Sequence, residues 1–223
     1  MAVRSIVLVS AGVSQPSSTR LLGDRLLVAT IAALAERGID ARSHVVEVRD
    51  HGHDLVDNVI TGFPSRSLRR AVELVKEADG IVAVSPVYNG SYSGLFKLFF
   101  DVLERGSLHG HPLLLGATGG TQRHSLALDF GFRPLFAYLG ASAVPTAVFA
   151  ASADWGTGAE ETAGPESQGA EPGLAERIDR AGAELAEAVA ARDRVAMTDP
   201  FASPTPFEQL LGGSAVGRDP GER

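Results

Sequence analysis

The chain has 223 residues, of which 44% are hydrophobic and 21% are charged, and this is enough for one domain with a full core. Its formal net charge of −7 argues against nucleic acid or an anionic membrane as the main partner. The sequence contains no cysteine, which excludes disulfides, thiolate catalysis and iron–sulfur clusters. The N-terminal apolar run, Ile6 to Val9, is too short for a signal peptide or a membrane span, so we expect a cytoplasmic protein.

The first third of the chain is predicted to alternate between buried strands and helices. Leucines recur at helical spacing after Thr19, and Gly38 is placed to end that helix. The predicted elements are a strand at 5–9, a helix at 19–37, a strand at 45–48, an irregular segment at 49–64, and a helix from Ser65 or Ser67 to Glu77.

The centre of the chain is an unbroken apolar run at 81–84, which is typical of a strand buried on both faces. Pro86 is expected to end this strand, and a turn rich in hydroxyl groups and glycine follows it. Ser93 is a suitable N-cap for the next helix, at 95–103. That helix is apolar nearly all round, so we expect it to be buried in the fold or shared with another subunit.

The remainder continues the alternation and then changes in composition. The predicted elements are a strand at 111–117, a helix at 125–139, a strand at 143–149, a mobile loop at 154–172 and an amphipathic helix at 173–192. Strands alternating with helices predict a parallel sheet with right-handed crossovers. We expect one domain over residues 1–193 and a partly disordered tail over 194–223.

Three loops follow the carboxyl ends of predicted parallel strands, where open α/β sheets bind ligands. The first loop ends in Ser17, Ser18, Thr19 and Arg20 at the start of a helix. Hydroxyl groups, free backbone N–H groups and a guanidinium suit a phosphate monoester, although the same residues also commonly cap helices. The loop has neither the Gly-x-Gly-x-x-Gly of a dinucleotide fold nor the Gly-Lys-Ser/Thr of a P-loop.

The other two loops suit a flat ring. Residues 86–89 offer backbone polar groups and the aromatic Tyr88 to a planar heterocycle, or else form an ordinary connection. The small residues of 118–121 would let a ring lie against the backbone, or else serve as a flexible link.

No acid/base pair and no metal site stand out in the sequence. Two His-x-His pairs, at 51–53 and 109–111, have no third ligand nearby and fit surface histidines better than a metal site. A phosphorylated planar cofactor that supplies its own chemistry fits these features best, and FMN is the natural candidate.

At these residues the sequence resembles the NAD(P)H-dependent FMN reductases of the flavodoxin-like superfamily. It is most similar to those that supply reduced flavin to two-component monooxygenases. The resemblance covers residues 5–149 and is densest at 78–88, 92–97 and 117–121. An aspartate–aromatic pair followed by a proline, typical of the family, is present as Asp129, Phe130 and Pro134.

The resemblance implies a flavodoxin-like three-layer α/β/α sandwich with a five-stranded parallel sheet. It also implies hydride transfer from NADPH or NADH to FMN, in a homodimer or homotetramer that partners a flavin-dependent monooxygenase. The chemistry would belong to flavin N5, so no catalytic side chain is expected. The implied site residues are Ser10, Ser17, Ser18, Thr19 and Arg20 for the FMN phosphate, Pro86, Val87, Tyr88 and Asn89 for the isoalloxazine, and Thr118, Gly119, Gly120 and Thr121 for its far edge.

Several alternatives remain open from the sequence. Phe130 stands where relatives in sulfonate systems carry a tyrosine linked to weak flavin binding, so FMN is either a substrate or a bound prosthetic group. In the second case the acceptor would be a quinone, an azo dye or a metal oxyanion. A non-enzymatic electron carrier of the flavodoxin type and a regulatory domain without flavin are further alternatives. No arginine cluster for a 2′-phosphate is identifiable, so NADH and NADPH are not distinguished.

Overall fold

Parallel strands form the sheet in the computed structural model, which describes residues 3–155 and 173–192. The strand order is β2–β1–β3–β5, with β6 and β7 both paired to β5 on one side, and β4 pairs antiparallel with the end of β3. The bounds are β1 Arg4–Ser10, β2 Ala41–Glu47, β3 Gly80–Tyr88, β4 Ser91–Tyr92, β5 Pro112–Gly119, β6 Ser142–Ala143 and β7 Val148–Ala151. The predicted parallel α/β sheet is confirmed.

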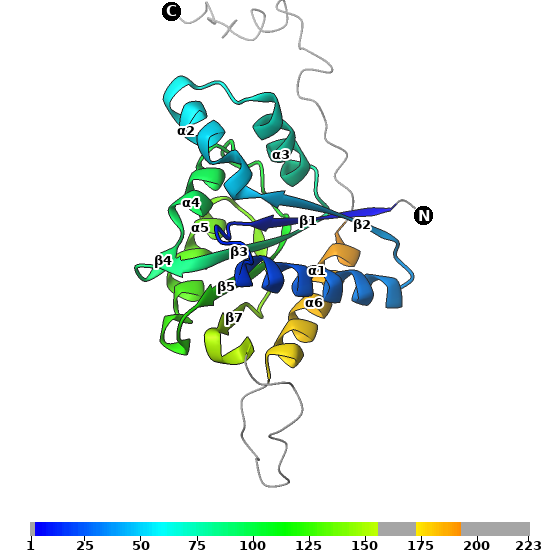
Figure 1. The fold of residues 1–223 in the computed structure, drawn as a ribbon. Helices are drawn as coiled ribbons and strands as arrows, with labels where there is room; N and C mark the ends of the chain where they lie inside the picture. The colour runs from blue at the N-terminus through cyan, green and yellow to red at the C-terminus, as the bar shows by residue number, and fades with distance from the viewer. Residues whose placement is uncertain (1–2, 156–172, 193–223) are drawn as a thin grey trace, which may run out of the picture. The chain divides into compact units, whose positions relative to one another are not determined.

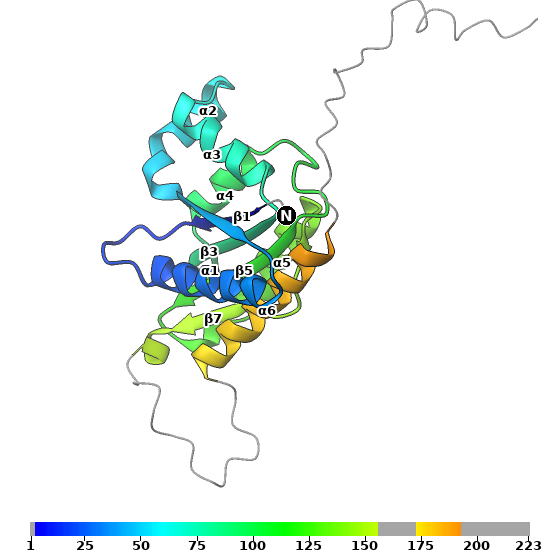
Figure 2. The same cartoon turned by 90° about the vertical axis from the view of Figure 1, so that its right-hand side faces the viewer.

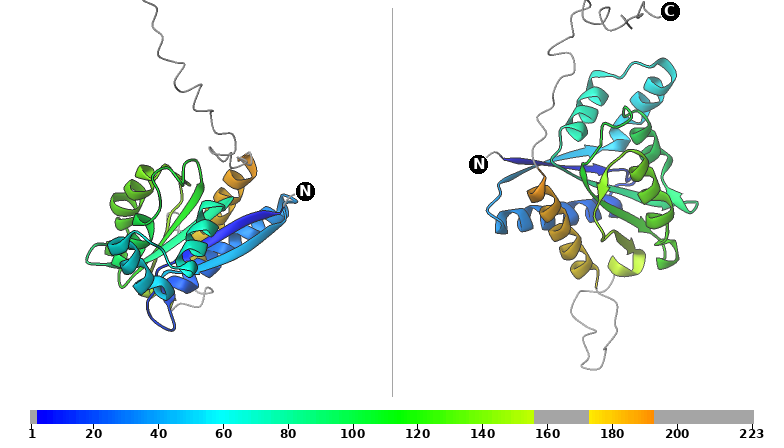
Figure 3. Two further views of the ribbon diagram at one scale, coloured as in Figure 1. Left: turned by 90° about the horizontal axis from the view of Figure 1, so that it is seen from above. Right: turned by 180° about the vertical axis from the view of Figure 1, so that it is seen from behind.

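Helices cover both faces of the sheet (Figures 1 and 2). Two of them, α1 (Ser18–Glu36) and α6 (Leu174–Ala191), lie side by side on one face, as the view from behind in Figure 3 also shows. The other face carries α2 Gly52–Thr61, α3 Arg66–Lys76, α4 Gly94–Asp101 and α5 Arg133–Tyr138. Among the described residues, no helix is long and apolar enough to cross a membrane.

The central strand shows why both faces need a helical layer. Ile81 and Ala83 belong to the hydrophobic core under α3 and α4, while Val82 and Val84 belong to the core under α1 and α6. Successive side chains of a strand point to opposite faces, so an unbroken apolar run must be covered twice. The predicted two-sided burial of this strand is confirmed.

The sequence predicts that Pro86 ends the strand, and this prediction is wrong. β3 continues to Tyr88, with Pro86 opposite Thr118 of β5. The carbonyl of Val84 points toward β1, where it accepts from the N–H of Ala11. Backbone groups two residues apart in a strand point to the same side, so the N–H that Pro86 lacks would also have pointed toward β1. Because β1 ends at Ser10, no strand on that side needs the missing donor.

Three predicted elements also differ from the structure. The segment expected to be irregular contains α2, which buries only Leu55 among its side chains. The helix expected at 125–139 is divided into a π-helical turn at Leu128–Phe132 and α5, and a 3-10 turn at Gln122–His124 precedes them. The strand expected at 143–149 is interrupted between β6 and β7, where Pro145 cannot donate to a ladder.

The apolar helix expected to be buried all round is only partly so within this chain. Phe96, Phe99 and Phe100 of α4 are fully buried, whereas Leu95 and Leu98 are half-buried. Phe96 and Phe100 each contact the ring of Phe136, with centroids 6.0 and 4.7 Å away. The domain itself therefore covers most of the apolar surface that had suggested a second subunit.

All but the first two residues of the loop predicted at 154–172, and the whole tail predicted at 194–223, lie outside the described residues. Asp154 and Trp155, the first two residues of that loop, belong to the ordered 3-10 turn η4 (Ser152–Trp155).

Candidate active site at the carboxyl edge of the sheet

A cleft of about 340 Å³ lies where the loops after β1, β3, β5 and β7 converge. This volume is within the usual range for small-molecule sites. The lining residues are Val13, Ser14, Ser18, Thr19, Pro86, Val87, Tyr88, Thr118, Gly119, Gly120, Ser152 and Trp155. The structure thus brings the three loops selected from the sequence together at one edge, and it adds a fourth.

The first wall of the cleft is the start of α1. Ser17 is the N-cap and its Oγ accepts from Arg20 N at 3.2 Å, which leaves the hydroxyl hydrogen of Ser17 to donate elsewhere. Ser18 and Thr19 follow in the first turn, where backbone N–H groups have no partner within the helix. Thr19 is buried, and its hydroxyl bonds that of Thr118 at 2.7 Å.

The loop before α1 suits a phosphate monoester on two counts. Ser10 is fully buried at the end of β1, and among the described residues no hydrogen bond reaches its Oγ. Gly12 lies so close to Ser17 that a Cβ there would be 2.1 Å from Ser17 Oγ, so the loop folds tightly only with glycine. A hydroxyl-rich loop at a helix N-terminus is the donor set that a phosphate requires.

Arg20 lies outside the cleft lining and is bound to carboxylates. Its Nε donates to Asp24 at 2.8 Å and its Nη1 to Glu47 at 2.5 Å. Burial lowers the pKa of the Arg20 guanidinium, but the hydrogen bonds and charges of these two carboxylates outweigh that effect and raise it. A role for Arg20 in phosphate binding stays a prediction.

The second wall is the β3–β4 hairpin. Asn89, with φ of 49°, and Gly90, with φ of 84°, form its two-residue turn, which is why Asn89 is exposed and not in the cleft lining. Tyr88 precedes the turn and is 50% exposed, so part of its side chain is accessible to a ligand. Ser85 Oγ accepts from Ser93 N at 2.9 Å and fastens the base of this hairpin.

The third wall is the end of β5. Thr118 is buried, while Gly119 and Gly120 open progressively towards solvent. Thr121 is exposed and outside the lining, where its hydroxyl accepts from Arg123 N at 3.3 Å and caps the following 3-10 turn. Among the predicted residues, Ser10, Ser17, Arg20, Asn89 and Thr121 therefore lie behind or beside the cleft.

Four lining residues were missed in the sequence: Val13, Ser14, Ser152 and Trp155. The last two belong to the loop after β7, which is also the carboxyl end of a parallel strand. The rule that selected the other three loops applies to this one too, and it failed only because the strand was predicted to end early and the residues after 153 were predicted to be mobile.

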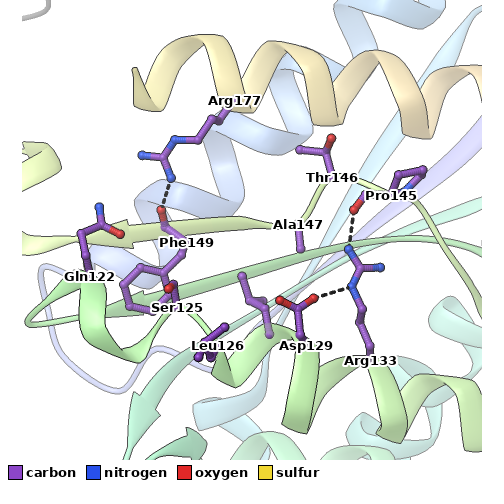
Figure 4. A pocket seen from close by; sticks show the side chains of 11 residues that line it. Gln122, Ser125, Leu126, Asp129, Arg133, Pro145, Thr146, Ala147, Phe149 and Arg177 are labelled. Atoms are coloured by element: carbon purple, nitrogen blue, oxygen red, sulfur yellow. Dashed lines mark hydrogen bonds and ion pairs between the residues drawn. The ribbon is translucent and has the colours of Figure 1, made fainter. Parts of the chain in front are cut away.

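A second cavity of about 340 Å³ lies between the segment that follows β5, the connection from β6 to β7, and α6 (Figure 4). Its two arginines are held by acceptors of the chain itself. Arg133 bonds Asp129 at 3.0 Å and the carbonyl oxygen of Pro145, and Arg177 Nη1 donates to the carbonyl of Phe149 at 2.6 Å. We therefore expect neither guanidinium to bind a phosphate.

The cleft offers little for acid/base or metal chemistry. Among the described residues lining it, Tyr88 is the only titratable side chain. Within residues 3–155 and 173–192, no group of three histidine, aspartate or glutamate side chains is placed to hold a metal ion. The described lining of this cleft consists of hydroxyl, backbone, apolar and aromatic groups, which can bind and orient a ligand.

The sequence profile of the family described as NADPH-dependent FMN reductase matches residues 4–156. The chain belongs to this family. An FMN reductase (NADPH) of Pseudomonas aeruginosa is 38% identical over 152 residues, which cover 67% of this chain and 78% of that protein. An NADH-dependent FMN reductase of Pseudomonas putida, SfnE, is 37% identical with the same coverage of both chains.

Solved structures agree with this assignment of the family. An oxidoreductase from Corynebacterium diphtheriae is 38% identical, with a TM-score of 0.77 over 86% of this chain and 99% of that one. The apo form of the NADH:FMN oxidoreductase EmoB is 26% identical, with a TM-score of 0.68 over 85% of this chain and 91% of that one. The flavodoxin-like fold expected for this FMN reductase family member is confirmed.

Proposed function

We propose that the protein transfers a hydride from NADPH or NADH to FMN, and that both nucleotides meet in the cleft described above. One observation supports this location: hydroxyl groups of Ser18 and Thr19 share a single cleft with the half-exposed ring of Tyr88. A phosphate and a flat heterocycle need these two kinds of wall at opposite ends of one site. The proposal also follows the activity for which the family is named.

We assign the phosphate end of FMN to the start of α1. Ser18 and Thr19 would donate hydroxyl and backbone hydrogen bonds there, and the N-terminal end of the helix favours the negative charge. Ser10, buried and without a partner among the described residues, is available to a ligand that enters the loop. Ser17 caps the helix through its oxygen, and donation of its hydroxyl hydrogen to the phosphate stays a prediction.

We assign the isoalloxazine end to the hairpin and to the end of β5. Pro86, Val87 and Tyr88 would line one side of the ring, and Thr118 to Gly120 would hold its far edge. Bound FMN supplies the chemistry, because its N5 accepts the hydride from nicotinamide C4. The protein's part is to hold two rings in contact and in the correct orientation, since orientation alone lowers such a barrier substantially.

The test is NADH and NADPH oxidation by flavin-stripped protein, with FMN titrated in. We expect saturable turnover that requires FMN, and an FMN dissociation constant about tenfold higher in Ser18→Ala, the size of one lost hydrogen bond to a charged group. The matched control is Ser67→Ala, because Ser67 is an exposed serine of α3 outside the cleft lining. Unchanged affinity in Ser18→Ala would contradict the phosphate assignment.

The same assay separates the alternatives. Release of reduced FMN to a second enzyme identifies a reductase that treats FMN as substrate. Turnover on one tightly bound flavin with a quinone or dye as acceptor identifies the alternative with bound FMN. Flavin binding without oxidation of either nicotinamide nucleotide identifies an electron carrier. Absence of flavin binding would refute every enzymatic version.

We further propose a homodimer or homotetramer. Leu126, Phe130 and Tyr138 are 60%, 79% and 71% exposed on the segment that contains the π-helical turn, which is unusual for such large apolar side chains. Sedimentation at micromolar concentration should show an oligomer that Phe130→Glu dissociates, and a monomeric wild type would contradict this. Supply of reduced flavin to a monooxygenase and a cytoplasmic location stay predictions from the sequence.

A further inference from the structure

The turn η4 closes the cleft on the side of α1. It directly follows β7, and two of its four residues, Ser152 and Trp155, line the cleft together with Ser18 and Thr19. Trp155 is the single tryptophan of the chain. Nothing in the expected flavin site accounts for a second aromatic side chain in the cleft that Tyr88 also lines.

Trp155 packs against α1, the helix whose first turn forms the phosphate end of the cleft. The guanidinium carbon of Arg25 lies 5.2 Å from the centroid of the indole ring, a cation–π contact. Arg25 follows Ser18 by seven residues, which places both on one face of α1, two turns apart. The indole therefore lies along the helix face that begins at Ser18.

Asp154 fixes the turn that carries Trp155. Its Oδ2 accepts from Ala151 N at 2.7 Å and from Gln122 Nε2 at 2.8 Å, and its Oδ1 accepts from Arg177 Nη2 at 3.2 Å. Gln122 directly follows the third loop, and Arg177 reaches across from α6 (Figure 4). One carboxylate thus joins the third loop, the fourth loop and α6.

The indole N–H is available to a ligand. Within residues 3–155 and 173–192, no hydrogen bond to Trp155 is present, and its ring is only half-buried. An indole N–H can only donate, so its natural partner in this cleft is a negatively charged or carbonyl oxygen. The phosphate end of the site, at Ser18 and Thr19, is where such an oxygen is expected.

We propose that Trp155 is a ligand-contacting residue at the phosphate end of the FMN site, and that Asp154 is the residue that positions it. This inference rests on the proposed function, because it takes the phosphate of FMN to lie at the start of α1. Trp155 then selects for the phosphorylated flavin over riboflavin, and it contributes to flavin affinity rather than to the hydride transfer step.

The experiment compares the dissociation constants of FMN and riboflavin for the wild type, Trp155→Phe and Trp155→Ala. We expect Trp155→Ala to weaken FMN binding about tenfold and riboflavin binding less than about twofold. Trp155→Phe, which keeps a ring but loses the donor, should lose most of the same selectivity. The matched control is Phe63→Ala, which removes an 80% exposed aromatic ring far along the chain and outside the cleft lining.

Asp154→Asn tests the positioning role. It should weaken FMN binding as much as Trp155→Ala does. The double variant should bind FMN no more weakly than Trp155→Ala alone, because both changes remove the same contact. A general loss of structure would add to the effect and would lower the affinity for both flavins alike.

Each outcome bears on a separate claim. If the wild type binds no FMN, the proposed function fails and the inference fails with it. If the wild type binds FMN and Trp155→Ala stays within twofold of it, or loses FMN and riboflavin equally, the proposed function stands and the role of Trp155 at the phosphate is refuted.

Discussion

Thr19 Oγ1 and Thr118 Oγ1 lie 2.7 Å apart and form a buried hydrogen bond between residues 99 positions apart in the chain. The bond joins the first turn of α1 to the end of β5, and both residues line the cleft. It fixes the distance between the wall that we assign to the phosphate and the wall that we assign to the ring edge. The cleft is thereby shaped before any ligand enters.

Thr118→Val should destabilise the protein by about 1–3 kcal/mol, because it leaves the buried Thr19 hydroxyl without a partner. Thr19→Val should cost a similar amount, and the double variant less than the sum of the two, since both hydroxyls are then gone. Urea unfolding of the four proteins measures this coupling. Additive losses would show that the two hydroxyls do not depend on each other.

Local rules were enough to predict most of the elements. The unbroken apolar run at 81–84 could only be a two-sided strand, and the capping serines Ser65 and Ser93 are found where their hydroxyls suggested, accepting from Leu68 N and Phe96 N. The three loops could be selected because the carboxyl ends of parallel strands share an edge. Each of these inferences uses only residues that are neighbours in the sequence.

The errors concern features that distant residues decide. Whether Pro86 ends a strand depends on where β1 stops, which the residues around Pro86 do not reveal. In the helix α2, Val59 and Ile60 are 57% and 76% exposed. The apolar residues of this segment are therefore not arranged by burial in a core, and their pattern did not predict the helix. Trp155 joins the cleft through Asp154 and its partners Gln122 and Arg177, a network that no local spacing predicts.

His111 makes stability depend on pH. Burial lowers the pKa of His111, and the charge of Arg192 lowers it further. The unfolded chain therefore binds a proton at His111 more readily than the folded protein, so stability is complete above the ordinary histidine pKa of about 6.5 and is lost as the pH falls below it. We expect the free energy of unfolding in urea to decrease steadily from pH 6.5 to pH 5.

His111→Gln should flatten this dependence. The imidazole Nε2 lies 3.0 Å from the carbonyl oxygen of Lys76, and a glutamine amide can donate to the same acceptor without titrating. Unfolding midpoints of the variant and the wild type, measured at several pH values, should converge as the pH falls. An unchanged pH dependence in the variant would assign the acid sensitivity to other groups.

Gly182 lets α6 approach α1. A Cβ at this position would lie 2.8 Å from Ala29 Cβ and 2.9 Å from Thr30 N, and the backbone of α1 cannot move aside as a side chain can. Gly182→Ala should therefore destabilise the protein by about 1–3 kcal/mol through overpacking, despite the better helix propensity of alanine. Gly94→Ala in α4, where nothing lies within 4 Å, is the control and should not destabilise. Equal stability of both variants would mean that the two helices separate without cost.

Ser85 supports the hairpin that presents Tyr88. It is fully buried, its Oγ accepts from Ser93 N at 2.9 Å, and it donates to the carbonyl of Pro86 at 2.9 Å. Ser85→Ala leaves the buried Ser93 N–H without an acceptor, and we expect a loss of about 1–3 kcal/mol in urea unfolding. The loosened hairpin should also weaken FMN binding, because the wall of the cleft that contacts the isoalloxazine ring is no longer held in place.

Ser93→Ala is the comparison that isolates the effect on the site. Ser93 Oγ caps α4 by accepting from Phe96 N at 3.3 Å, so its loss should cost about 1 kcal/mol while the Ser93 N–H stays bonded to Ser85. We therefore expect Ser93→Ala to lower stability with FMN affinity near that of the wild type, and Ser85→Ala to lower both. If Ser85→Ala loses stability but keeps full FMN affinity, the hairpin is held by its own turn at Asn89 and Gly90, and Tyr88 is positioned without Ser85.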